Sequence, residues 1–317
     1  MTIAFHSHTM TLRGSEHALW DYANFNESLL GNRSVICHPE HLARDENPMY
    51  AKWKARFQLV SYQTKVELAR KLRMIGAEAL YQIKPGTYDG FIVPGLRNCI
   101  HSMFLSDEYH GDRFAYVSRW AAKVMTGHEE SFVPHFVPKL ESSENLRAKL
   151  GIPNGARVFG RHGAADTFNI SFAQRAVFEH ARNCADDHFV FLNTEPIRGT
   201  EQFSNVHYLP ATVDTVEKSK FLATCDAMLH ARWHGETFGL AVGEFAVLGK
   251  PVITFSESRE RAHLEMLGNQ SLQYRHAGEL IKILRDFGPH RTQGTEYEIF
   301  ADPKVVMEIF QKKFLDN

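Results

Sequence analysis

Short apolar runs alternate with longer segments of helical periodicity along nearly the whole chain of 317 residues. This alternation is typical of βαβ units, in which helices join consecutive strands of a parallel sheet. We therefore expect an α/β protein, with Gly31 and Gly76 ending two of its helices as C-terminal caps. In the first half the pattern predicts helices over residues 15–30, 64–75 and 119–125, and strands over 2–7, 34–38, 57–62, 78–83, 89–93, 100–104 and 114–118.

An extended apolar stretch near the middle of the chain, SFVPHFVPKL, is interrupted by Pro134 and Pro138. Proline lacks an N–H group and disfavours helix in the residue before it, so this stretch reads as a connection between domains. The pattern then restarts, with helices predicted over 145–150, 172–184 and 214–224 and strands over 157–160, 188–193, 205–210 and 226–231. We thus expect an N-terminal domain over 1–138 and a C-terminal domain over 139–301.

The last segment, 302–317, has the pattern of a single amphipathic helix. Asp302 is suited to the N-cap and Pro303 to the first helical position, and the apolar side chains that follow share one face. We expect this helix to return to the N-terminal domain.

Composition excludes several classes of protein. Lys and Arg number 36 against 37 Asp and Glu, and 44% of residues are hydrophobic, which argues against a disordered chain and against a general nucleic-acid binder. No apolar run approaches the length of about 20 residues that spans a bilayer, and the start of the chain lacks the pattern of a signal peptide, so we expect a cytoplasmic protein. The cysteines show no C-x-x-C spacing and are predicted to be reduced core residues: Cys37, Cys99, Cys184 and Cys225.

The most informative stretch is GETFGLAVGEFAVLGKPVI, in which seven residues separate Glu236 from Glu244. If the intervening chain is helical, the two carboxylates lie about 12 Å apart along the axis. That separation suits an elongated ligand such as a nucleotide sugar, whose sugar and ribose hydroxyls lie on either side of a diphosphate. The N–H groups near Thr237, Phe238 and Gly239 would then face the phosphates. The alternative is a solvated turn and helix, but the apolar neighbours indicate a buried helix, in which an unpaired carboxylate is costly.

This stretch resembles the E-x7-E signature of retaining glycosyltransferases of the GT-B fold, glycosyltransferase family 4 in particular. The resemblance implies two Rossmann-like domains facing each other across a cleft, with the nucleotide-sugar donor bound mainly by the C-terminal domain. It implies that Glu236 contacts the donor sugar, that Glu244 holds the ribose, and that the backbone at Phe238 and Gly239 lies near the phosphates. Phe245 stands where the family usually has alanine, a difference that affects packing more than chemistry.

Other positions gain an expected role from the same resemblance. Gly14 and Ser15 follow the first strand, where the family places a glycine-rich loop beside donor and acceptor. Arg161 ends the first strand of the C-terminal domain, where a family arginine neutralises the donor diphosphate, and the loop at Gly163 follows it. His101 matches a family histidine that hydrogen-bonds the donor sugar near the reacting carbon. Each position also has a structural interpretation: a simple turn, a surface ion pair and a core histidine.

Two features depart from the family or extend it. The family usually has a lysine five or six residues after the arginine, whereas this chain has Asp166 and Thr167 there and no lysine until Lys218. The backbone of the Gly163 loop would then bind the second phosphate, or the donor would bind more weakly. His6 and His8 lie two residues apart and share one face of the first strand, where they are suited to contact the acceptor, or less readily a metal ion.

The chain contains no D-x-D triplet, the motif through which many glycosyltransferases bind their donor by a divalent ion. We therefore expect no cofactor and no metal requirement. The sequence also lacks the motifs G-x-x-x-x-G-K-[ST], G-x-G-x-x-G and G-x-S-x-G, which argues against P-loop enzymes, dinucleotide-linked dehydrogenases and α/β-hydrolases.

The expected activity is transfer of a sugar, with retention, from a UDP- or GDP-linked donor to a glycan or other hydroxyl acceptor. The sequence leaves two alternatives open. One is a hydrolysing nucleotide-sugar epimerase, for which Asp107, Glu108 and Asp112 are generic acid–base candidates. The other is a catalytically silent module that binds a nucleotide sugar or a glycan.

Overall fold

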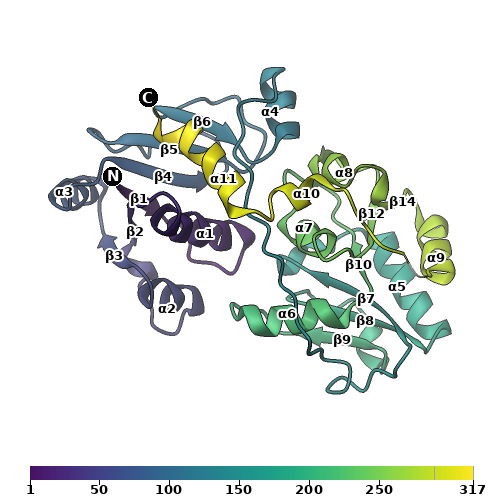
Figure 1. Ribbon diagram of the computed structural model, residues 1–317. Coiled ribbons are helices and arrows are strands. Elements are labelled where there is room, and N and C mark those ends of the chain that lie inside the picture. The colour runs from purple at the N-terminus through teal and green to yellow at the C-terminus, as the bar shows by residue number, and fades with distance from the viewer. Residues whose placement is uncertain (289, 317) are drawn as a thin grey trace. The chain divides into compact units, whose positions relative to one another are not determined.

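The computed structural model describes residues 1–288 and 290–316 and divides the chain into two compact units (Figure 1). Unit 1 comprises Met1–Phe136 together with the segment from Asp302 onward, and unit 2 comprises Val137–Ala301. The division falls two residues before the boundary expected from the prolines. Within the described residues no helix is both long and apolar enough to span a membrane.

Unit 1 is built on a six-stranded parallel sheet with the strand order β3-β2-β1-β4-β5-β6. Its strands are β1 (Thr2–His6), β2 (Arg33–Pro39), β3 (Gln58–Tyr62), β4 (Ala79–Lys84), β5 (Arg97–Ser102) and β6 (Arg113–Tyr116). Its helices before the crossing to unit 2 are α1 (Gly14–Ser28), α2 (Pro48–Lys54), α3 (Lys65–Met74) and α4 (Arg119–Thr126), with a short 3-10 turn, η1 (Glu40–Leu42).

Local sequence signals explain the ends of several of these helices. The Thr64 hydroxyl accepts a hydrogen bond from the Glu67 N–H and caps the N-terminus of α3. Gly31 and Gly76 follow α1 and α3 with φ angles of 66° and 69°, a conformation that glycine adopts without steric cost. The predicted caps of the first two long helices are thereby confirmed.

The C-terminal segment packs on unit 1, as its amphipathic pattern predicted. Helix α11 (Pro303–Phe310) begins after Asp302, whose side chain accepts from the Lys304 N–H, and continues into a π-helical turn, η5 (Gln311–Leu315). The ring of Phe310 stacks on Tyr22 of α1 with centroids 5.1 Å apart and lies 6.5 Å from Phe5 of β1.

Unit 2 repeats the architecture of unit 1 with the strand order β14-β12-β10-β7-β8-β9, again parallel (Figure 1). Its main strands are β7 (Arg157–His162), β8 (Asp187–Leu192), β9 (Val206–Leu209), β10 (Ala227–His230), β12 (Val252–Phe255) and β14 (Leu272–Tyr274). Two short strands, β11 (Gly235–Glu236) and β13 (Glu260–Arg261), pair with each other. The helices are α5 (Ser171–Asn183), α6 (Thr215–Thr224), α7 (Leu240–Ala246), α8 (Ala262–Leu267), α9 (Ala277–Asp286) and α10 (Glu296–Ile299), and the 3-10 turns are η2 (Ala165–Thr167), η3 (Thr200–Gln202) and η4 (Gly268–Gln270).

The predicted strand over 89–93 and the predicted helix over 145–150 are not present. The prediction that the cysteines are reduced core residues holds for most of them. Residues 89–93 form a loop rather than a strand, because the Asp89 carboxylate accepts the Phe91 N–H and Gly90 adopts a φ of 72°. Residues 145–150 form turns rather than a helix. All four cysteines are free, and only Cys184 is partly exposed.

Each sheet has one pair of adjacent strands at which the strand order reverses, so that the connections leaving these two strands run toward opposite edges of the sheet. In unit 1 these strands are β1 and β4, and in unit 2 they are β7 and β10. Crevices at the carboxyl ends of the strands at such a switch point are the usual ligand sites of open α/β sheets. The side chains that follow β7 and β10, and those that follow β1 and β4, are therefore the first to consider as functional.

Candidate functional site

The GETFG segment follows β10 in unit 2 and owes its shape to its glycines. Gly235 has a φ of 75°, and a Cβ there would lie 1.9 Å from the carbonyl oxygen of Glu260, so only glycine allows β11 to pair with β13. Gly239 has a φ of 86° and precedes the first residue of α7. Glu236 thus lies on a strand and Glu244 on a helix. The chain between them is not one continuous helix, because it turns at Gly239, so the condition for the separation of about 12 Å is not met.

Helix α10 packs directly on this segment. The hydroxyl of Tyr297 donates to the carbonyl oxygen of Phe238 at 2.5 Å, and its ring lies where a Cβ on Gly243 would approach to 2.6 Å. The side chain of Phe238 is buried and meets the Tyr297 ring edge-on, with centroids 5.7 Å apart. The buried Phe238 side chain is therefore not available to a ligand.

Glu236 is held by two basic side chains. Nη1 of Arg232 lies 2.6 Å from one carboxylate oxygen and Nε2 of His230 lies 3.3 Å from the other. Burial alone would raise the pKa of Glu236, but the charge of Arg232 and the contact with His230 lower it to about 2. The carboxylate is thus ionised at neutral pH and fixed in position.

A second layer of neutral groups supports His230. Its Nδ1 lies 2.9 Å from the hydroxyl of Thr254, and Nε2 of His263 lies 3.2 Å from the same hydroxyl. Burial lowers the pKa of His263 to about 3, so its ring is neutral. Because the His263 ring is neutral, it places no positive charge next to His230, which contacts Glu236.

Glu244 is buried, whereas Glu236 is half-buried, and the basic partners of Glu244 come from other elements. Nζ of Lys218 on α6 lies 2.5 Å from Oε1, and Nε2 of His162 at the end of β7 lies 2.9 Å from Oε2. The second contact is close but poorly aligned, and neither of its two atoms completes a hydrogen bond with any described residue. Burial would raise the pKa of Glu244, whereas Lys218 and then His162 lower it to about 2.

Arg161 occupies the end of β7 but is committed to the protein. Its Nη1 donates to the carbonyl of Asn193 and to Thr194, and its Nη2 donates to the carbonyl of Ala164 and to Thr167. Four of the five guanidinium N–H donors are thereby used. The side chain is 4% exposed, and burial lowers its pKa to about 10. Arg161 ties together the loops after β7 and β8, and among the described residues its Nε–H is the one guanidinium donor without a partner.

The loops that Arg161 joins have unusual backbone conformations. Asn193 is a non-glycine residue with a φ of 49°, and its side-chain amide donates to the carbonyl of Gly163, whose own φ is 149°. Such conformations persist where the surroundings hold them, and here Arg161 donates to the carbonyl of Asn193. Asp166 lies in η2, and Thr167, at the position of the expected lysine, hydrogen-bonds Arg161 instead.

Sequence reasoning missed four basic residues of this site: His162, Lys218, His230 and Arg232. The sequence could have indicated them in one way: a buried carboxylate requires a cation nearby, so a basic side chain had to lie close to each glutamate. Arg232 precedes Glu236 by four residues and could have been found in this way. Lys218 is 26 residues from Glu244 in the sequence, and only the tertiary structure brings the two side chains together.

His101 does not fit its expected role. It is fully buried in unit 1, its Nδ1 lies 2.6 Å from the Tyr81 hydroxyl, and its Nε2 lies 2.9 Å from the carbonyl oxygen of Val133. Both ring nitrogens are therefore occupied, and burial lowers its pKa so that the ring is neutral. The structure makes His101 a core residue, because a sugar hydroxyl would find no free nitrogen on it.

The loop from β1 to α1 differs from a glycine-rich loop. Gly14 and Ser15 are the first two residues of α1, and the left-handed residue of the loop is Met10, with a φ of 47°. His6 and His8 do lie together: Nδ1 of His6 is 3.2 Å from Nε2 of His8. That contact joins the two rings to each other.

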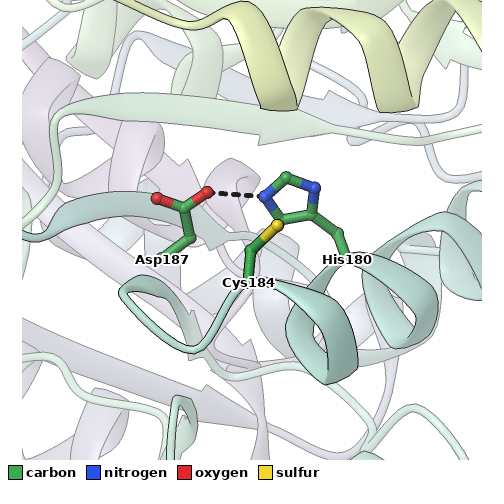
Figure 2. Close-up of side chains that lie close together, drawn as sticks. All are labelled: His180, Cys184 and Asp187. Carbon is green, nitrogen blue, oxygen red and sulfur yellow. Dashed lines mark hydrogen bonds and ion pairs between the residues drawn. The ribbon is translucent and has the colours of Figure 1, made fainter.

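A third group of side chains resembles a metal site in composition. Ligand atoms of His180, Cys184 and Asp187 all lie within 4.8 Å of one another (Figure 2). Asp187 is already bonded, however, to His180 Nε2 at 2.6 Å and to Arg157 through both carboxylate oxygens, at 2.7 and 2.5 Å. Arg157 and Asp187 begin β7 and β8, so the group lies at the amino ends of the strands. It is an ion-pair cluster at the opposite end of the strands from their carboxyl ends, where ligands of such sheets usually bind.

Comparison with known proteins identifies the architecture. No model of a protein family matches the sequence, and no curated protein matches it either. Solved structures do match over nearly the whole chain. Anabaena Alr3699/HepE in complex with UDP-glucose has a TM-score of 0.68 and 15% identity, covering 99% of this chain and 95% of that one.

Two further structures have the same architecture. AviGT4, a glycosyltransferase involved in avilamycin A biosynthesis, has a TM-score of 0.59 and 16% identity over 99% of this chain and 97% of its own. UDP-GlcNAc 2-epimerase from Neisseria meningitidis bound to UDP-GlcNAc has a TM-score of 0.63 and 11% identity over 100% of both chains. The chain has the GT-B fold. At these identities the likeness concerns architecture, which glycosyltransferases and epimerases share.

Proposed function

We propose that the chain is a glycosyltransferase that takes its sugar from a nucleotide-sugar donor bound at the carboxyl edge of unit 2. The observation that carries the proposal is the pair of ionised carboxylates, the half-buried Glu236 and the buried Glu244, at the switch point of that sheet. Ionised carboxylates accept hydrogen bonds strongly, and a nucleotide sugar presents hydroxyls at two places. HepE, of the same fold, is in complex with UDP-glucose, which favours a UDP-linked donor.

Each carboxylate has a distinct role in this proposal. Glu236 accepts hydrogen bonds from the donor sugar, and Glu244 accepts them from the ribose hydroxyls. The backbone N–H groups of Thr237, Phe238 and Gly239 lie between them in sequence and face the diphosphate. Because α7 has only seven residues, side-chain cations must supply much of the positive charge there.

The proposed reaction proceeds with retention and without a metal ion. The nucleoside diphosphate leaves with its bonding electrons while the acceptor oxygen attacks from the same face, and the departing phosphate takes the acceptor proton. Negative charge grows on the leaving group and is stabilised by fixed positive groups, among which Arg232 lies beside Glu236. No protein nucleophile is required. The absence of a D-x-D triplet from the sequence supports the metal-independent form.

The epimerase alternative has less support from the side chains. A UDP-GlcNAc 2-epimerase shares the fold. Of its three generic acid–base candidates, Glu108 accepts the Tyr88 N–H and Asp112 accepts the Asn98 N–H, so both serve loop structure. Asp107 is exposed, and within the described part of the chain its side chain makes no hydrogen bond, while its backbone carbonyl accepts the Tyr109 N–H.

The test is a thermal-shift series of the full chain with UDP, GDP, ADP and CMP and with their sugar conjugates, first without and then with Mg²⁺. A ligand that binds only the folded state raises its stability, by about 2.7 kcal/mol at 100 times its Kd. We expect UDP and a UDP-sugar to raise the melting temperature without added metal. Failure of every nucleotide to do so would overturn the proposal, and product analysis after incubation with UDP-GlcNAc would separate a transferase from an epimerase.

A further inference from the structure

A tryptophan of unit 2 is exposed close to Glu236 in the sequence. Trp233 is 57% exposed, whereas Trp53 and Trp120 are at most 9% exposed. Trp233 follows β10 and precedes Glu236 by three residues. Since β10 borders the switch point of its sheet, Trp233 lies at the edge where open α/β sheets bind their ligands. An exposed aromatic side chain at that edge is a candidate contact for a ligand.

The chain around Trp233 is held by hydrogen bonds on both sides. The Trp233 N–H donates to Oδ1 of Asn169 at 2.8 Å. The carbonyl oxygen of Arg232 accepts the Gly235 N–H at 3.1 Å and the Ser258 hydroxyl at 3.3 Å. A side chain on a backbone fixed in this way loses little conformational freedom when it binds a ligand.

The Trp233 ring is itself anchored on one face. It stacks on the ring of Phe255, with centroids 5.6 Å apart and planes 22° from parallel. Phe255 is 3% exposed and packs against Tyr274 in the core of unit 2, with centroids 5.9 Å apart. Single exposed apolar residues are common on proteins, but this indole is supported on one face, which leaves the other face for a ligand. It forms a flat and rigid apolar surface.

The Asn169 side chain adds a hydrogen-bond donor next to Trp233. Because Oδ1 accepts the Trp233 N–H, the other branch of the amide is its NH2 group. Asn169 is exposed, and within the described part of the chain this NH2 group has no hydrogen-bond partner. The Asn169 N–H donates to the carbonyl oxygen of Ala231 at 3.0 Å, which joins the loop after η2 to the chain that leaves β10. The NH2 group is therefore fixed in place and available to a ligand.

Trp233, Asn169 and Glu236 complement the kinds of surface that a sugar presents. A pyranose carries C–H groups on the faces of its ring and hydroxyl groups around its rim. The C–H groups pack against an aromatic face through dispersion, an amide NH2 group donates to hydroxyl oxygens, and a carboxylate accepts from hydroxyl hydrogens. Arg232, which directly precedes Trp233, lies 2.6 Å from Glu236 and ties the carboxylate to the same loop.

We propose that Trp233 and Asn169 bind the sugar of the nucleotide-sugar donor and select a hexopyranose. The indole stacks on the C–H face of the sugar, and the Asn169 NH2 group donates to one of its hydroxyls. The inference rests on the proposed transferase function and names the class of donor sugar and two residues that recognise it. A hexose carries a C6 methylene that a pentose lacks, so it buries more apolar area on the indole.

Titration calorimetry of the full chain with UDP and matched UDP-sugars tests the inference. UDP-glucose and UDP-galactose are the hexose donors, and UDP-xylose and UDP-L-arabinopyranose are their counterparts without the C6 hydroxymethyl group. We expect at least one UDP-hexose to bind about fourfold more tightly than its pentose counterpart, the effect of burying one more methylene group. Equal or tighter binding of both pentose donors would overturn the selection of a hexose.

Variants then identify the residues. The readout is the ratio of the Kd for the UDP-hexose to the Kd for UDP, because a change in phosphate binding affects both ligands and cancels. Trp233→Ala should raise this ratio about tenfold, since a stacked contact is lost, and Trp233→Phe should raise it less than about threefold. Asn169→Asp keeps the oxygen that accepts the Trp233 N–H but removes the NH2 donor, and it should raise the ratio about tenfold.

Controls and a second readout accompany the variants. Tyr88 and Asn269 are exposed, and Tyr88→Ala and Asn269→Asp should leave the Kd ratio unchanged. A sugar stacked on Trp233 changes the surroundings of its ring, so the UDP-hexose should alter the tryptophan fluorescence of the wild type more than UDP does. This additional change should be absent from Trp233→Phe.

The outcomes separate this inference from the proposed function. Binding of UDP together with a Kd ratio that Trp233→Ala leaves unchanged would refute the inference while the donor site stands. An equal loss of affinity for UDP and for the UDP-hexose in Trp233→Ala would also refute it, because the residue would then contact the nucleotide. If the wild type binds neither UDP nor any UDP-sugar, the proposed function fails and the inference fails with it.

Discussion

The ammonium group of Lys218 lies 2.5 Å from Oε1 of Glu244 and joins the helices α6 and α7 of unit 2. Glu244 is 3% exposed, and a carboxylate so deeply buried stays ionised only with a cation beside it. The sequence places no lysine where the family usually has one. Lys218 brings a positive charge to the same edge of the sheet from a different element, and it does so as the partner of the proposed ribose-binding group.

Lys218→Met should therefore weaken both the fold and nucleotide binding. Removal of one partner from a buried ion pair costs about 3–5 kcal/mol because the other charge is left uncompensated. Urea denaturation of the variant should show a loss of that order, and calorimetry should show weaker UDP binding. Lys220→Met is the matched control, since Lys220 pairs with the exposed carboxylates of Glu144 and Glu217. Equal effects of the two substitutions would contradict a special role for Lys218.

Glu236→Gln and Glu244→Gln should have different effects on ligand binding. Loss of the Glu244 charge should raise the Kd for UDP and for a UDP-sugar about equally, by roughly tenfold, because both ligands contain ribose. Loss of the Glu236 charge should affect only the UDP-sugar. Titration calorimetry with both ligands measures the difference, and the exposed Glu201 provides a control as Glu201→Gln. An equal effect of Glu236→Gln on UDP itself would argue that this residue binds the nucleotide.

Arg161→Lys should reduce stability more than nucleotide affinity. Four of its donors hold the loops after β7 and β8, and lysine cannot reproduce that planar arrangement. We expect a loss of about 2–4 kcal/mol in the free energy of unfolding, as for the removal of several hydrogen bonds to a buried charge. Arg175→Lys on the exposed face of α5 is the control. A stable variant that has lost UDP binding would instead support the direct phosphate contact expected from the sequence.

Acidification should destabilise the protein in two stages. Burial lowers the pKa of His135 and of His263 to about 3, below the ordinary 6.5, so the unfolded chain takes up protons first as the pH falls below about 6.5. Each should cost about 2 kcal/mol of stability by pH 5. The carboxylates of Glu236 and Glu244 add a second stage, because their contribution is complete above pH 4.5 and is lost as the pH falls toward 2.

Urea denaturation at pH 8, 7, 6 and 5 measures the first stage. His135→Asn should flatten the dependence between pH 7 and 5, since the neutral amide has no proton to gain. A wild-type stability that is constant from pH 7 to 5 would contradict the assignment of these rings as neutral and buried.

The cluster at the amino ends of β7 and β8 should respond to charge removal but not to metal. Asp187→Asn removes the partner of Arg157 and His180 and should lower the free energy of unfolding by about 1–3 kcal/mol, whereas Asp186→Asn, at the exposed neighbouring position, should have little effect. Equimolar Zn²⁺ or a chelator should leave the wild-type melting temperature unchanged. A clear rise with Zn²⁺ that depends on Cys184 would identify a metal site instead.

Sequence reasoning succeeded where a signal is local. The order of most strands and helices and the glycine caps follow from patterns within a few residues. It failed where the outcome depends on residues far apart in the chain. The bonds of Arg161 to Thr194 and the pairing of His101 with Val133 join different elements. A guanidinium and an imidazole on strand ends have the same sequence signature whether they face a ligand or the protein interior.

The N–H of Val137 donates to the carbonyl oxygen of Phe300 at 3.0 Å, so the segments through which the chain enters and leaves unit 2 are joined side by side. Unit 2 is thus a contiguous insertion within unit 1, whose own sequence is interrupted. The chain passes between the units at residues 136–137 and again at 301–302. After a single proteolytic cut at one of these connections, the two units are still joined covalently by the other connection. The two units become independent molecules only if residue 136 is joined directly to residue 302 and unit 2 is expressed as a separate polypeptide over 137–301.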